Sequence, residues 1–307
     1  MQLDALDKKI LAELCLDSRT PILTLAKRVR TAREVVLYRI KRLEREKIIC
    51  GYITEINFDK LGLIGAAVFV KINVEDEERF FQYLETCPFV SWVARLSGVW
   101  NFGLSIYGKN LENLDDNFLK LKKEFFLLKF RFSIHKKNKF FQEKLFFKDK
   151  KQLILPPLIH SLDKLDKIIL EKLSKNSRIT VVELSNKVGL TAPAVAKRIR
   201  ILEKSDYIQK YSLFLDYSSL GLFQYSIFVE SSSYSSLLSY LYSNPKISFI
   251  AEYVGDPFLE MGLILSDPYN LRIFLEEIEQ KFKSQVIEVS LFQKDVVSVS
   301  PPKIAFE

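Results

Sequence analysis

The sequence has few of the residues on which most enzyme and metal sites depend. In 307 residues it has only two histidines, His135 and His160, and three cysteines, Cys15, Cys50 and Cys87. The cysteines are odd in number and lack metal-ligand spacing, so neither a disulfide framework nor a metal site is expected. No nucleophile-histidine-acid set and no Gly-x-x-x-x-Gly-Lys phosphate loop is present. We therefore expect no cofactor, no metal and no enzymatic activity.

Long apolar stretches are also missing. No segment reaches about 18 uninterrupted apolar residues, and the chain starts with charged, helix-forming residues. At 48% hydrophobic and 27% charged residues, the composition is typical of globular proteins. The sequence thus predicts a cytoplasmic protein with no membrane partner.

The chain contains a long internal repeat. The segment Leu6-Asp7-Lys8-Lys9-Ile10-Leu11 recurs as Leu165-Asp166-Lys167-Ile168-Ile169-Leu170, at an offset of 159 residues that holds without a gap for about sixty residues. Solenoid repeats are about 20–50 residues long. The longer offset therefore indicates duplicated domains.

Charge is distributed according to this repeat. Residues 1–50 and residues 160–210 each carry a net charge of +5, whereas residues 51–100 carry −3 and residues 211–307 carry −6. A basic head followed by a largely acidic body occurs twice, and basic heads suit a polyanionic partner.

Each head is predicted to be a winged helix-turn-helix domain. Apolar residues at three- and four-residue steps indicate a first helix in both copies, followed by short helices over residues 22–29 and 181–188. Gly189 suits a left-handed helix end, Thr191 suits a helix cap, and Pro193 suits an early helical position. Alternating segments at residues 47–56 and 206–214 predict a two-stranded wing.

The third helix of each head, over residues 32–45 and 192–204, has the two faces of a DNA-reading helix. One face is apolar, and the other carries cationic and polar side chains that suit the major groove. The candidate DNA-binding residues are Arg33, Glu34, Tyr38, Arg39, Lys41, Arg45, Thr191, Ala192, Pro193, Lys197, Arg198, Arg200 and Lys204. Double-stranded DNA is the predicted partner.

The bodies each show the strand and helix order β-α-β-β-α-β, the ferredoxin-like pattern. The fold class is therefore α+β, with two winged helix-turn-helix domains (residues 1–60 and 160–219) alternating with two ferredoxin-like sheet domains (61–150 and 220–302). A sheet covered on one face leaves an apolar face in need of a partner. We expect the two bodies to supply that partner to each other within one chain, as a pseudo-dimer. Residues 136–151 mix lysine with phenylalanine, which suits either contact with nucleic acid or, as we expect, a strand extension with a solvated lysine edge.

The repeat resembles the Lrp/AsnC (feast/famine) family of transcription regulators. The residues that carry the resemblance are Leu6-Asp7-x-x-Ile10-Leu11, Ser18-Arg19, Val36-x-x-Arg39-Ile40-x-x-Leu43-Glu44 and Leu184-x-x-x-Val188-Gly189-Leu190-Thr191. The resemblance implies sequence-specific DNA binding through the third helix, self-association through the sheet domains, and a small effector, typically an amino acid, near the turn between the second and third strands. The implied effector positions are Gly98, Trp100, Asn101, Gly255, Asp256 and Phe258.

Two other functions remain open. Siroheme decarboxylases resemble Lrp/AsnC regulators in fold, and such an enzyme would be expected to use histidine and arginine in the sheet domains, where the sequence offers His135 at an edge and few arginines. A non-specific architectural DNA-binding protein would also carry basic heads.

Overall fold

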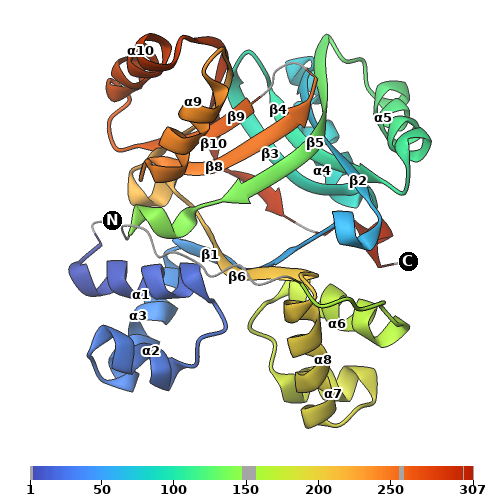
Figure 1. Ribbon diagram of the computed structural model, residues 1–307, viewed down its shortest axis with the longest axis vertical. Helices are drawn as coiled ribbons and strands as arrows, with labels where there is room; N and C mark the ends of the chain where they lie inside the picture. The colour runs from blue at the N-terminus through green and yellow to red at the C-terminus, as the bar shows by residue number, and fades with distance from the viewer. Residues whose placement is uncertain (1–2, 147–156, 256–258, 300, 307) are drawn as a thin grey trace. The chain divides into compact units, whose positions relative to one another are not determined.

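The computed structural model of the chain describes residues 3–146, 157–255, 259–299 and 301–306. It consists of two compact units (Figure 1). The head unit contains residues 1–62, 150–216 and 303–307, and the body unit contains residues 63–149 and 217–302. Each unit combines segments from both copies of the repeat, so the two heads form one unit and the two bodies form the other.

Each head has three helices and one strand. The elements of the first head are α1 (Ala5–Leu16), α2 (Ile22–Val29), α3 (Arg33–Arg45) and β1 (Ile49–Ile56); those of the second head are α6 (Lys164–Lys175), α7 (Val181–Val188), α8 (Ala192–Lys204) and β6 (Ile208–Leu215). α1 and α6 both begin with a capping box, in which an aspartate (Asp4 or Asp163) and a second one three residues later satisfy exposed amide groups at the helix start.

The two strands predicted for the wing are present, and they pair with each other across the two heads. Each head has a single strand, and β1 pairs antiparallel with β6, from Ile49 opposite Leu215 to Ile56 opposite Ile208. This two-stranded ribbon lies between the two heads (Figure 1). Unpaired strand edges are unfavourable, and pairing between the heads satisfies both strands at once.

Further hydrogen bonds connect the heads. The Ser18 and Ser177 hydroxyl oxygens, which occupy equivalent positions, lie 2.6 Å apart in a buried contact. Arg19 Nη1 donates to the carbonyl oxygens of Ser177 and Ile179, the latter at 3.0 Å. The two heads are therefore held together as one body.

In the body unit, both copies have the predicted β-α-β-β-α-β order. The first copy contains β2 (Ile64–Lys71), α4 (Glu77–Thr86), β3 (Val90–Gly98), β4 (Phe102–Gly108), α5 (Leu111–Glu124) and β5 (Lys129–Phe140). The second contains β7 (Phe223–Ser231), α9 (Tyr234–Ser243), β8 (Ile247–Val254), β9 (Leu259–Leu265), α10 (Asn270–Phe282) and β10 (Ser284–Val299). The predicted α+β fold class is confirmed.

The two sheets close into one barrel with the strand order β10-β3-β4-β2-β5-β8-β9-β7. β5 pairs with β8 and β10 pairs with β3, so both junctions join the first copy to the second. The helices lie outside the strands (Figure 1). The predicted association of the bodies is thus present, and it includes backbone pairing at both edges in addition to facing apolar surfaces.

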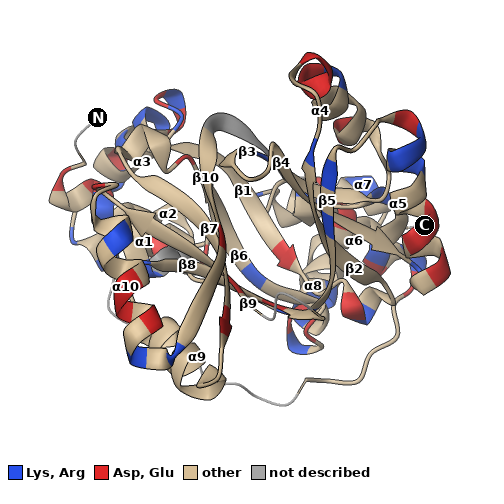
Figure 2. Ribbon diagram, turned by 90° about the horizontal axis from the view of Figure 1, so that it is seen from above, with Lys and Arg blue, Asp and Glu red and all other residues tan. Residues whose placement is uncertain are grey.

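The lysine-rich segment after residue 135 lengthens β5 as far as Phe140, as predicted. Basic residues lie along this strand (Figure 2). Residues 147–151 of that segment lie outside the described residues. Among the helices of the described ranges, none combines the length and apolar character needed to cross a bilayer.

Candidate nucleic-acid interface

The third helix of the first head separates its residues into two faces. Val36, Ile40 and Leu43 are buried against the head, at most 5% exposed. The opposite face contains the exposed candidates Glu34, Tyr38, Lys41 and Arg45, and Arg33 is exposed at the start of the helix. Tyr38 is 62% exposed although it is a large aromatic residue, so its ring is available for contact with another molecule.

The third helix of the second head repeats this division. Val195, Ile199 and Leu202 are buried, at most 5% exposed. The exposed candidates are Thr191, Pro193, Lys197, Arg200 and Lys204, with Ala192 half-buried at the start of the helix. Both heads therefore present a cationic helix face.

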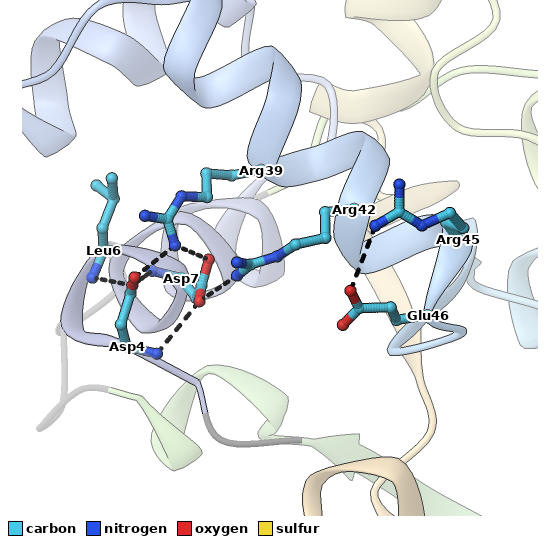
Figure 3. Close-up of polar contacts among 7 residues, drawn as sticks. All are labelled: Asp4, Leu6, Asp7, Arg39, Arg42, Arg45 and Glu46. Carbon is cyan, nitrogen blue, oxygen red and sulfur yellow. Dashed lines mark hydrogen bonds and ion pairs between the residues drawn. The ribbon is translucent and has the colours of Figure 1, made fainter.

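Arg39 and Arg198 are placed differently from the other candidates. Arg39 Nη1 lies 3.1 Å from Asp7 Oδ1 and also contacts Asp4, and the Asp7 side chain is 1% exposed (Figure 3). Arg198 Nη1 lies 2.7 Å from carboxylate oxygens of both Asp163 and Asp166. Both guanidinium groups thus face carboxylates at the start of the first helix of their own head. This geometry assigns them to positioning the third helix.

Arg42 also serves this internal network, and sequence reasoning missed it. Its Nη2 lies 2.5 Å from Asp7 Oδ2, so one buried carboxylate receives two arginines (Figure 3). A hydrogen bond from the Asp7 amide and the side chain of Arg39 lower the pKa of Asp4 to about 2. The sequence signal for this network was the recurrence of Asp7 as Asp166. Aspartate is rarely buried without a partner, so a buried aspartate at this position would require a basic residue beside it.

The turn before the third helix has the same backbone geometry in both heads. Arg30 at φ 56° and Gly189 at φ 68° both adopt the left-handed conformation that ends the second helix. The Thr191 hydroxyl accepts a hydrogen bond from the Ala194 amide at 3.4 Å. Ala32, at the equivalent position, makes no side-chain cap, so the first head carries a less favourable turn.

The effector positions implied for the first body are occupied by internal contacts. Trp100 is 1% exposed, and its Nε1 donates to Glu288 Oε2 at 2.7 Å. The Asn101 side chain accepts from the Ile72 amide at 3.0 Å and donates to Glu77 at 2.9 Å. Gly98 pairs with Ser290 in the barrel.

In the second body, Gly255 ends its strand with φ 97°. Asp256 and Phe258 lie outside the described residues.

The interior of the barrel contains ionisable groups that sequence reasoning did not single out. Glu260 is 3% exposed and accepts hydrogen bonds from Ser226, at 2.6 Å, and from Tyr253. Burial raises the pKa of Glu260 to about 7. The available signal was one charged residue within the apolar strand Leu259–Leu265.

His135 lies on β5, the edge strand of the first body as predicted, where closure of the barrel pairs it with β8 of the second body. Its strand, β5, has neighbours on both sides, and its ring lies between Tyr107 and Tyr253, with centroid distances of 6.3 and 5.4 Å. Burial lowers the pKa of His135 to about 4. In the described ranges, no cluster of three or more His, Cys, Asp or Glu side chains could hold a metal ion.

Comparison with known proteins identifies the heads. Residues 3–44 match the AsnC-type helix-turn-helix domain, and residues 162–209 match a winged helix-turn-helix DNA-binding domain. The HTH-type transcriptional regulator LrpC of Bacillus subtilis is 32% identical over 117 residues, which cover 38% of this chain and 81% of LrpC. An uncharacterized HTH-type regulator of Pyrococcus furiosus is 35% identical over 116 residues, covering 36% of this chain and 75% of its own.

Almost the whole length of the chain is similar in fold to the solved structure of the siroheme decarboxylase NirDL. The TM-score is 0.64 at 13% identity, and the match covers 98% of this chain and 94% of that one. At such low identity the similarity shows only the fold. Both proteins have the tandem arrangement. The two head matches, and the regulators that are matched over most of their length, show that the chain belongs to the Lrp/AsnC family in a tandem-duplicated form.

Proposed function

We propose that the chain is a sequence-specific DNA-binding transcription regulator in which one polypeptide supplies both DNA-reading heads. The observation that carries this proposal is the exposed cationic face of the third helix in each head, opposite a fully buried apolar stripe. Lysine and arginine on such a face attract phosphates, while the helix itself fits the major groove.

The connection between the heads supports this function. β1 and β6 pair along their length, and Ser18 contacts Ser177. This joins two reading helices in one body, as a dimer of single-headed regulators would. A fixed distance between the helices would select a fixed spacing between half-sites.

We assign no effector to this proposal. Trp100 and Asn101 already have internal hydrogen-bond partners, so a ligand at this turn would have to displace them. An amino-acid effector therefore remains a suggestion of the family resemblance.

A siroheme-decarboxylase-like activity is the second candidate, and the full-length similarity to NirDL favours it. His135 and Arg131 lie on the inner face of the barrel, as such a site would require. Against this candidate, Trp100, Phe69 and Phe228 fill the described interior and are each 1% exposed. A tetrapyrrole bound to the purified protein would give a Soret absorption band, and such a band would favour the enzyme.

The DNA-binding proposal is tested by removing charge from each helix face. Replacing Lys41 and Arg45 with alanine, or Lys197 and Arg200 with alanine, should lower affinity about ten-fold and reduce the salt dependence by about one counterion per lost phosphate contact. Fluorescence anisotropy on a DNA site selected from random sequence measures both.

The matched control replaces Lys122 and Lys123 with alanine, since these are exposed on α5 in the body unit. This control should bind as the unmodified protein does. If neither double variant in the heads changes affinity, the assignment of these helices to DNA reading fails. Equal affinity for selected and random DNA would instead indicate an architectural protein.

A further inference from the structure

The interior of the barrel brings two equivalent rows of side chains together. The strand register places Phe69 between Arg131 on β5 and Gly103 on β4. In the second body the same register places Phe228 between Glu288 on β10 and Glu260 on β9. We call the sets Arg131-Phe69-Gly103 and Glu288-Phe228-Glu260 the first and second interior rows.

The two rows face each other across the barrel. The Phe69 and Phe228 rings, which are 159 residues apart in equivalent positions, meet edge to face with their centroids 4.8 Å apart. The side chains beside them are therefore brought close to the other copy's row.

One pair of equivalent positions, Arg131 and Glu288, carries opposite charges, and these two side chains pair with each other. Arg131 Nη2 lies 3.2 Å from Glu288 Oε1, with side chains only 17% and 10% exposed. The Arg131 guanidinium also lies 5.2 Å from the centre of the Phe228 ring. Arginine at one equivalent position thus binds glutamate at the other.

Two more groups of the first body contact the Glu288 carboxylate. Trp100 Nε1 donates to Glu288 Oε2 at 2.7 Å, and Lys129 Nζ lies 3.8 Å from Glu288 Oε1. Trp100 and Arg131, which donate hydrogen bonds to Glu288, and Lys129, which forms an ion pair with it, all belong to the first body.

The ends of the rows also differ in size. A Cβ atom at Gly103 would lie 3.0 Å from the Phe69 ring, so the first row has no room for a longer side chain. The second row has Glu260 at this position, held by Ser226 and Tyr253. The equivalents of these two partners in the first body, Ala67 and Leu96, are apolar and could not hold a carboxylate.

We propose that the two interior rows make each body selective for the unlike body, so that the chain pairs with itself in cis and excludes pairing between like bodies. Two first rows would bring Arg131 against a second Arg131. Two second rows would bring Glu288 against Glu288 with Glu260 nearby. Like charges with little solvent repel strongly, and such repulsion is an effective source of specificity.

The first test uses charge exchange in the full chain. Arg131→Glu and Glu288→Arg should each lower the midpoint of thermal unfolding by about 6–12 °C, because each leaves like charges facing in a largely buried site. The double variant R131E/E288R should recover at least half of that loss. The control Arg272→Glu changes an exposed i,i+4 pair on α10, where Arg272 is 87% exposed, and should shift the midpoint by no more than about 2 °C.

The second test reads partner choice directly. The R131E chain has glutamate at both of these equivalent positions and the E288R chain has arginine at both, so co-expressed chains should exchange bodies and form mixed assemblies seen by native mass spectrometry. Differently tagged unmodified chains, co-expressed in the same way, give the background level of mixing. A several-fold excess of mixed assemblies supports the proposal.

Mixing at the background level would overturn it, as would a double variant no more stable than the single variants. If the single variants do not fold alone, recovery of folded protein on co-expression gives the same answer. Neither test depends on whether the heads bind DNA.

Discussion

The charged residues of the third helices fall into two groups with different roles. Arg39, Arg42 and Arg198 contact buried aspartates, and they connect the first and third helices of a head. Lys41 and Arg45 lie on the exposed face of α3. A basic residue on an amphipathic helix is thus not interchangeable with its neighbours, because a buried carboxylate requires a hydrogen-bonded partner.

Glu260 provides a prediction at the residue scale. Burial raises its pKa from 4.5 to about 7, so the folded protein favours the protonated carboxyl. Its stabilising contribution is therefore fully present below pH 4.5 and is lost as the pH rises through 7. Relative to Glu260→Gln, the free energy of unfolding of the unmodified protein should fall by about 3 kcal/mol between pH 4.5 and pH 8. Urea unfolding of both proteins at each pH measures this difference.

The ionisation of His135 changes the free energy of unfolding in the opposite direction with pH, and the comparison with Glu260→Gln controls for it. Burial lowers its pKa from 6.5 to about 4, so its contribution is present above pH 6.5 and is lost as the pH falls through 4. The histidine is common to both proteins, so its effect cancels in the difference. A difference between the two proteins that stays constant with pH would show that Glu260 ionises normally.

At the scale of elements, local sequence determines most helix and strand limits. The predicted spans 22–29, 181–188 and 192–204 match α2, α7 and α8, and the predicted third helix at 32–45 begins one residue earlier than α3. These limits are set by nearby residues such as Gly189 and Thr191, whose conformations end one helix and begin the next. Such signals require no knowledge of distant contacts.

The two turns give a prediction at this scale. Arg30 and Gly189 share the left-handed conformation, which costs a non-glycine residue about 1 kcal/mol. Arg30→Gly should therefore stabilise the protein by about 1 kcal/mol, and Gly189→Arg should destabilise it by a similar amount. No atom lies within 4 Å of a Cβ built at Gly189, so backbone strain alone is being tested.

Both changes in the free energy of unfolding are measured by chemical denaturation, with amide hydrogen exchange followed separately in the two heads. Ala32→Thr, which copies the cap at Thr191, should add about 1 kcal/mol to the first head independently. Arg30→Gly without any stabilisation would mean that the arginine side chain makes a compensating contribution.

At the scale of the whole molecule, duplication has made two domains of each kind that are no longer equivalent. α3 presents Arg33, Glu34 and Tyr38 where α8 presents Ala192, Pro193 and Lys197. The first set offers hydrogen bonds to base edges, and the second offers mainly apolar contact at its start. The paired bodies show the same divergence in the interior rows.

We therefore expect the DNA site to have two unlike half-sites. Selection from random DNA followed by footprinting should return an asymmetric sequence. A chain carrying A192R, P193E and K197Y, which gives the second head the first head's surface, should select a more symmetric site. A palindrome selected by the unmodified protein would contradict this expectation.

The sequence alone determined the duplication, the order of elements in each copy, and the amphipathic third helices, because periodicity and helix-end residues act over a few positions. It also predicted that the bodies would associate, since each sheet has an apolar face. It could not determine that β1 pairs with β6, or that β5–β8 and β10–β3 close the barrel. Hydrophobic alternation shows which face of a strand is buried, but many strands could satisfy the same backbone groups.

The tertiary structure likewise decided the roles of individual charges. Arg39 and Lys41 are two positions apart in one basic helix, and only the packing of α1 against α3 assigns one to Asp7 and leaves the other exposed. Arg131 and Glu288 are 157 positions apart on strands that do not pair, and only the closure of the barrel brings their side chains to 3.2 Å. Local patterns fix which elements form, whereas the energy of a charge depends on the groups that folding places around it.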